Sequence, residues 1–186
     1  MQYSPNPTFK ILPLVQINHI KSKIDINSIR ELCSKGLPVN SPPEDRAIAW
    51  LNLLSIYPAN PQHWTTVCKT ITKSYHNITT NYSIDNYLDN YDVNDKKLMN
   101  SIKSDIDRSS IQLYYLIHDD GSACYSEDDE KELEIHMKRI ERILYVFAKI
   151  NPKFGYIQGF NELLIPIYYV MYSAKMLLLN QDDYVE

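Results

Sequence analysis

The chain has 186 residues, of which 44% are hydrophobic and 23% charged, as in an ordinary globular domain. Its formal net charge of −4 argues against a nucleic-acid-binding module, which would normally carry a basic surplus. Four glycines are too few for a turn-dense all-β fold, and three cysteines without a C-x-x-C pair predict reduced thiols in a cytoplasmic protein.

The N-terminal part of the chain predicts an irregular segment followed by helices. Residues 1–24 show no sustained hydrophobic period, and their prolines favour extended backbone. A first helix is expected to begin at a capping Asp25 and to end at Gly36. A second is expected over residues 41–58, with Ser41 and Glu44 as a capping box and Pro42 at the first helical position.

The middle of the chain carries two further helical patterns. Between residues 60 and 82, large side chains recur at spacings of three and four. After a polar stretch, a helix capped by Asp92 is expected to run to Ile106, which places Arg108 at or just beyond its end. Residues 111–117 form an apolar run that fits a strand or a short buried helix equally well.

The C-terminal part predicts two more helices. One begins at a capping box of Ser126 and Asp129 and ends at Asn151, and the last begins near Gln158. Residues 160–179 are apolar enough to suit a buried core helix or a membrane span, and the polar residues and proline within them favour the core helix. We therefore predict an all-α protein, a globular multi-helix array rather than an up-down bundle.

The usual chemical signatures are missing from the sequence. It contains neither of the glycine-rich phosphate-binding motifs, and its five histidines are scattered. We therefore expect no cofactor of the protein's own and no metal site.

Two short motifs stand out, I-x-x-D-x-x-R at residues 102–108 and Y-x-Q-G-x-N at residues 156–161. Gly-x-Pro at residues 36–38 and R-x-x-x-W at residues 46–50 precede them. Together and in this order, they resemble the TBC domain, the family of GTPase-activating proteins for Rab GTPases. The resemblance implies that residues 25–186 are a partial TBC domain, because family domains continue into a C-terminal subdomain that is missing here.

The resemblance assigns catalytic roles to Arg108 and Gln158, as an arginine finger and a glutamine finger that complete the active site of a GTPase. An arginine offers a planar fork of donors to phosphate oxygens, and a glutamine can orient a water. Taken singly, Arg108 would more often be a surface residue that neutralises Asp105 or Asp107, and Gln158 would be a polar group at a helix start.

Further residues are expected to support these two. Asp105 lies three residues before Arg108 and can pair with its guanidinium. By resemblance, Tyr156 and Gly159 shape the glutamine turn, Gly159 by permitting close backbone approach, and Asn161 ties the turn down. Structural roles, with the tryptophan in the core, are expected for Arg46 and Trp50.

The expected function is therefore acceleration of GTP hydrolysis in a GTP-bound Rab-type small GTPase, which would itself carry the GTP and Mg²⁺. No nucleic acid and no stable membrane insertion are expected, and the protein should be cytoplasmic or peripheral at endomembranes through its partner. One alternative is a non-catalytic GTPase-binding module of the same fold. The other is a membrane-anchored helical protein that uses residues 160–179.

Overall fold

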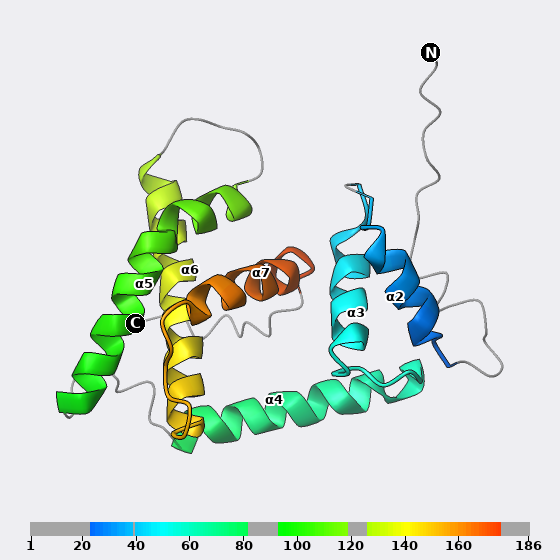
Figure 1. Cartoon of the computed structure of the whole chain (residues 1–186), viewed down its shortest axis with the longest axis horizontal. Helices are drawn as coiled ribbons and strands as arrows, with labels where there is room; N and C mark the ends of the chain where they lie inside the picture. The colour runs from blue at the N-terminus through cyan, green and yellow to red at the C-terminus, as the bar shows by residue number, and fades with distance from the viewer. Residues whose placement is uncertain (1–22, 39, 82–92, 119–125, 176–186) are drawn as a thin grey trace, which may run out of the picture. The chain divides into compact units, whose positions relative to one another are not determined.

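The structure, a computed structural model, describes residues 23–38, 40–81, 93–118 and 126–175, and all regular structure in these ranges is helical (Figure 1). This confirms the all-α class. The chain divides into two compact units, residues 1–73 with 170–186 and residues 74–169. In chain order the elements are α2 (Ile26–Ser34), α3 (Pro43–Leu53), the 3₁₀ turn η1 (Pro61–His63), α4 (Trp64–Asn81), α5 (Val93–Ile117), α6 (Glu127–Ile150) and α7 (Phe160–Ser173). The irregular segment expected over residues 1–24 lies almost wholly outside the described residues, as do Asp92 and Cys124.

Helices α2 and α3 form the core of the first unit. The Asp25 side chain accepts a hydrogen bond from the backbone N–H of Asn27, and Gly36 has φ +81°, so both predicted ends of α2 are confirmed. Apolar side chains of both helices and their flanks are buried together, namely Ile24, Ile29, Ile48 and Ala49. Cys33 and Cys68 are free thiols.

The predicted start of α3 is wrong. Its cap is Pro42, which makes no side-chain hydrogen bond, and the first helical residue is Pro43. A capping serine must stand directly before the first helical residue, and the second proline takes the position that suits it best, one residue further on. The Ser41 hydroxyl is consequently buried without a hydrogen-bond partner in the described part of the chain.

The tryptophan that packs on this core is Trp64 rather than Trp50. Trp64 contacts the buried cluster, donates its indole N–H to the carbonyl of Pro58 at 2.9 Å and stacks on Tyr57. Trp50 is half-buried, as Trp64 is, and its structural role stays a prediction. Arg46 is half-buried too, and within the described ranges no hydrogen bond or ion pair ties it to a neighbouring loop.

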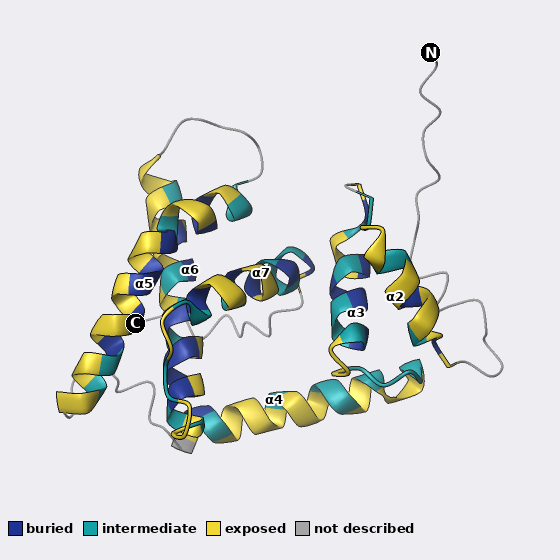
Figure 2. Cartoon of the chain, in the orientation of Figure 1, coloured by how far each residue is buried: buried dark blue, intermediate teal, exposed yellow. Residues whose placement is uncertain are grey.

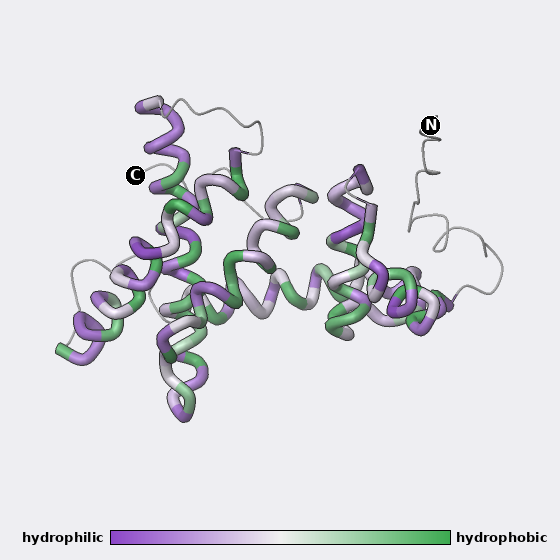
Figure 3. Tube along the Cα trace, turned by 45° about the horizontal axis from the view of Figure 1, so that its top comes forward, coloured by the Kyte–Doolittle hydropathy of each residue, from purple (hydrophilic) through white to green (hydrophobic). Residues whose placement is uncertain are grey.

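Helices α5 and α6 pack side by side and antiparallel in the second unit (Figure 1). Asp95 at the start of α5 pairs with Lys149 at the end of α6, with Nζ and Oδ1 2.8 Å apart. At the other end, the ring of His118 lies 3.5 Å from the carboxylate of Asp129. Ser126 and Asp129 form the predicted capping box of α6. Buried residues mark the packed sides of both helices (Figure 2), and hydrophobic and hydrophilic residues alternate along them (Figure 3).

Helix α5 is longer than predicted, and Arg108 lies in its middle rather than at its end. Residues 111–117 continue the helix instead of forming a strand or a separate short helix. The reason is that Leu113 extends the buried row of Ile102 and Ile106 by two further turns. Ser109 lies in the same row and donates its hydroxyl to the carbonyl of Asp105 at 3.2 Å, so its polar group is satisfied within the helix.

Helix α7 is buried unevenly. Ile165 and Tyr168 are buried, whereas Leu163 is 67% exposed. The Tyr168 hydroxyl lies 2.6 Å from Nδ1 of the buried His136 on α6, and burial lowers the pKa of that histidine to about 4. No helix in the described ranges is both long and apolar enough to cross a membrane.

Candidate functional site

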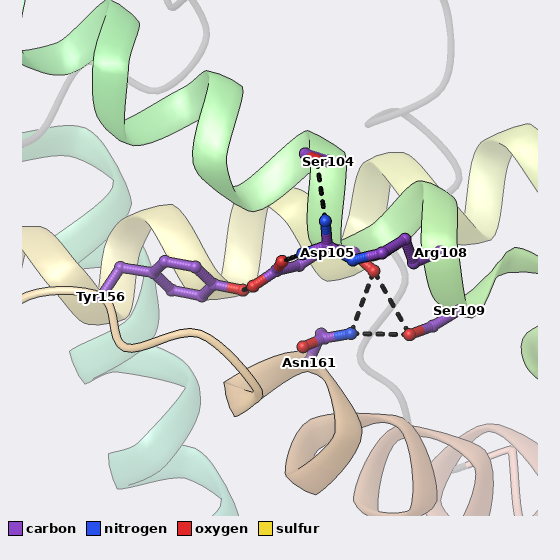
Figure 4. Close-up of polar contacts among 6 residues, drawn as sticks. All are labelled: Ser104, Asp105, Arg108, Ser109, Tyr156 and Asn161. Atoms are coloured by element: carbon purple, nitrogen blue, oxygen red, sulfur yellow. Dashed lines mark hydrogen bonds and ion pairs between the residues drawn. The ribbon is translucent and has the colours of Figure 1, made fainter.

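The carboxylate of Asp105 joins two segments that lie far apart in the sequence. Asp105 is on α5 and is 3% exposed. One of its oxygens forms an ion pair with Nη2 of Arg108, and the other accepts a hydrogen bond from the Tyr156 hydroxyl at 2.7 Å (Figure 4). A single buried carboxylate therefore fixes both the arginine on α5 and the chain segment that precedes α7.

The guanidinium of Arg108 is held by two neighbours on α5, although most of the side chain is exposed. Asp105, three residues earlier, forms the predicted pair with it, and Nη1 of Arg108 also donates to the Ser104 hydroxyl at 3.2 Å. The Arg108 side chain nevertheless stays 58% exposed. Of the five N–H donors of a guanidinium, these two contacts use two, so three remain for a ligand.

Tyr156 acts as a neutral donor toward Asp105. Burial raises the pKa of its hydroxyl, although the nearby charge of Arg108 pulls that pKa down. The proton therefore stays on the hydroxyl at physiological pH, and the hydrogen bond runs from Tyr156 to the carboxylate. Because a carboxylate acceptor carries charge, this bond is stronger than one between neutral groups.

Asn161 makes a second connection between the same two segments. Its Nδ2 donates to the carbonyl of Asp105 at 3.1 Å and to the hydroxyl of Ser109 at 2.7 Å. Asn161 is 3% exposed and belongs to the first turn of α7, so it ties the start of that helix to α5. This contact explains how an asparagine can hold the preceding turn in place.

Gln158 lies in the turn between Tyr156 and α7, and its side chain is exposed. Gly159 follows with φ +95°, a left-handed conformation that an L side chain rarely adopts. A methyl group built on Gly159 would meet no atom within 4 Å, so the expected close backbone approach is wrong and the glycine is required by conformation alone. Two exposed apolar residues, Phe154 and Ile157, precede Gln158 in the same loop.

A known protein family and several known proteins are similar in sequence to this chain. The family model of the Rab-GTPase-TBC domain matches residues 44–181, most of the chain. The chain belongs to this family.

GTPase-activating protein gyp1 of Schizosaccharomyces pombe is 28% identical over 152 residues, which are 81% of this chain and 25% of that protein. TBC domain-containing protein C1952.17c of the same organism is 52% identical over 42 residues, 23% of this chain and 7% of that protein. TBC1 domain family member 13 of Mus musculus is 50% identical over 36 residues, 19% of this chain and 9% of that protein. This TBC chain thus spans a quarter or less of the length of these relatives, and no solved structure matches it significantly.

The structure of this TBC chain brings four of the sequence-predicted site residues into direct contact, and they are Asp105, Arg108, Tyr156 and Asn161. Gln158 and Gly159 lie in the turn between the last two. Arg46 and Trp50 belong to the other unit.

Sequence reasoning missed two serines of the TBC site. Ser104 accepts from Arg108, and Ser109 accepts from Asn161. The signal that could have found them is the helical spacing, because Ser104 lies four residues before Arg108 and Ser109 four residues after Asp105. For Ser109, the predicted helix end near Ile106 hid that relationship, because α5 continues to Ile117.

An open hollow of about 550 Å³ borders Arg108 on the surface of α5. In the described part of the chain it is lined by Asn100, Lys103, Ser104, Asp107 and Arg108. All five of these residues have polar or charged side chains, and both signs of charge occur among them. The described residues include no cluster of three or more His, Cys, Asp or Glu side chains placed to hold a metal ion.

Proposed function

We propose that this TBC chain accelerates GTP hydrolysis in a Rab-type small GTPase by inserting Arg108 and Gln158 into the active site of the GTP-bound partner. The observation that supports this most directly is the Asp105 carboxylate, which binds Arg108 through one oxygen and Tyr156, two residues before Gln158, through the other. One buried group therefore holds the proposed arginine finger directly and holds, through Tyr156, the segment that leads to Gln158. The name of the relative gyp1, a GTPase-activating protein, agrees with the proposal.

Arg108 would stabilise charge on the phosphoryl group as it is transferred. That charge spreads over the phosphoryl oxygens, and a planar guanidinium meets such oxygens with paired donors. The contacts with Asp105 and Ser104 fix two donors of Arg108 and leave three for phosphate oxygens. The helical backbone around Arg108 is ordered in advance, and preorganised donors are the ones that stabilise transition-state charge well.

Gln158 would hold the attacking water. Its amide offers one carbonyl acceptor and two N–H donors, so it can accept from the water and at the same time orient it. The Tyr156 contact on one side and the left-handed Gly159 on the other restrict the backbone that carries Gln158. GTP and Mg²⁺ would be carried by the GTPase, and this chain would bring only its two side chains to the reaction.

The test is single-turnover GTP hydrolysis by a panel of purified, GTP-loaded Rab GTPases, with and without this chain. Arg108→Ala should lower the accelerated rate by about 10³ to 10⁵. Arg108→Lys should restore little, because lysine lacks the planar fork. Gln158→Ala should also lower the maximal rate. Matched controls are Arg30→Ala and Gln62→Ala, which remove exposed residues of the same types from the other unit and should change nothing.

Two outcomes would contradict the proposal. If Arg108→Ala kept most of the acceleration, the assignment of the arginine finger would be wrong. If the chain bound a GTP-loaded Rab without raising its hydrolysis rate, the non-catalytic GTPase-binding module would replace the activator as the function. Circular dichroism of each variant shows whether the helices are intact, so that a loss of rate is not a loss of fold.

A further inference from the structure

Two large exposed side chains follow Arg108 on helix α5. Ile111 is 71% exposed and Tyr115 is 68% exposed. They lie three and seven residues after Arg108, and at 3.6 residues per turn both fall on the same side of the helix as the arginine. Exposed residues along α5 are visible in Figure 2. The surface that Ile111 and Tyr115 form is called the α5 apolar face below.

The opposite side of the same two turns is buried, so the exposure of the α5 apolar face is not a result of loose packing. Leu113, on that side, is 1% exposed, and Tyr114, on the flank between the two sides, is 7% exposed. Single exposed hydrophobic residues are common on proteins, but here two of them are adjacent at i and i+4. Aromatic side chains, tyrosine among them, are enriched at the centres of protein interfaces.

The short distance from the α5 apolar face to Arg108 indicates which molecule binds this face. A rise of 1.5 Å per residue places Ile111 and Tyr115 about 5 and 10 Å along the helix from Arg108. A specific interface covers about 800 Å² on each partner, a disc of about 16 Å radius. A protein whose active site receives Arg108 therefore covers the α5 apolar face as well. On the other side of Arg108, the hollow lined by Asn100 and Lys103 offers polar contacts instead.

We propose that Ile111 and Tyr115 are the apolar docking surface for the GTPase that receives Arg108, an inference that rests on the proposed function. The patch on the GTPase that fits them is apolar, exposed and next to its nucleotide pocket. The two residues set the affinity for the partner and the choice among GTPases. They do not touch the reacting phosphate, so the maximal rate does not depend on them.

The test separates affinity from chemistry. Single-turnover hydrolysis is measured over a range of concentrations of this chain, for the unchanged chain and for Ile111→Asp and Tyr115→Asp. Each charged variant should raise the half-saturating concentration about tenfold, a typical effect of a central interface residue. The maximal rate should stay within a factor of about two, since binding alone is lost. Ile111→Leu and Tyr115→Phe should behave as the unchanged chain, because both keep an apolar side chain.

Control variants distinguish failure of this inference from failure of the proposed function. Ile135→Asp makes the same change at a 40%-exposed isoleucine of α6 and should leave both parameters unchanged. Arg108→Ala, measured in the same series, should reduce the maximal rate. If it does so while both charged α5 variants keep the normal half-saturating concentration, the docking surface alone is wrong. If the unchanged chain gives no acceleration, or Arg108→Ala loses none, both proposals are overturned.

A second copy of this chain is the competing occupant. Sedimentation of the unchanged chain and of Ile111→Asp shows whether the α5 apolar face joins two copies. A dimer that becomes a monomer in the variant, with the half-saturating concentration unchanged, would overturn the GTPase assignment. A monomer in both cases, with weaker activation by the variant, supports it.

Discussion

Replacing Tyr156 with phenylalanine removes one hydroxyl from the Asp105 carboxylate and leaves the aromatic ring in place. The ring keeps its edge-on contact with Phe160, so the change isolates the 2.7 Å hydrogen bond. Hydrogen bonds to charged groups contribute about 1.5 to 3 kcal/mol, and Asp105 is buried, so water does not replace the lost donor fully. Because Arg108 still pairs with the carboxylate, we expect a value of about 2 kcal/mol for the loss of unfolding free energy.

Urea unfolding at neutral pH, followed by circular dichroism, measures this loss as a lower midpoint at unchanged slope. Tyr115→Phe is the matched control, because it makes the same chemical change at an exposed tyrosine of α5, and it should cost less than about 0.5 kcal/mol. A double-mutant cycle with Asp105→Asn should give a coupling of at least about 0.5 kcal/mol. Equal costs for the two tyrosine variants, or no coupling, would refute the view that Asp105 joins α5 to the Gln158 turn.

Three further predictions concern other parts of the second unit. Gly159→Ala should lower the free energy of unfolding by about 1 kcal/mol or more, because alanine is strained at φ +95°, and thermal unfolding measures it. Ser126→Ala should cost about 1 kcal/mol in the same assay by removing the cap of α6; an unchanged melting temperature would contradict the capping role. The buried His136 has a pKa of about 4 in the folded chain and about 6.5 when unfolded, so between these values the unfolded chain binds more protons. The free energy of unfolding should therefore fall by about 2 kcal/mol from pH 7 to pH 5. In His136→Gln the part of this fall that the histidine causes should be absent. Urea unfolding at both pH values measures the difference.

The helical class and most helix ends could be predicted from the sequence because local signals fix them. The cap at Asp25, the left-handed Gly36 and the box of Ser126 and Asp129 each depend on a few neighbouring residues, and all three are confirmed. The start of α3 could not be predicted in the same way, because the pair of prolines competed with the capping box for the same positions.

The pairing of Asp105 with Arg108 was also predictable, since both residues belong to one helix and lie three positions apart. The contact between Asp105 and Tyr156 was not, because 51 residues separate them and only the packing of the second unit brings them together. The continuation of α5 past Arg108 likewise depends on tertiary burial of Leu113, which overrides the break in apolar pattern at residues 108–110.

The position of Arg108 within an unbroken helix has a consequence for the energetics of its proposed encounter. An arginine on a mobile loop would have to lose backbone freedom when it entered another protein, at about 1–2 kcal/mol for each residue ordered. The backbone around Arg108 loses that freedom when α5 forms, before any partner arrives. At the encounter only side-chain rotations remain to be restricted, and the contacts with Asp105 and Ser104 already restrict most of them. The entropy lost in ordering this backbone therefore lowers the free energy of unfolding of the chain and does not lower its affinity for a partner.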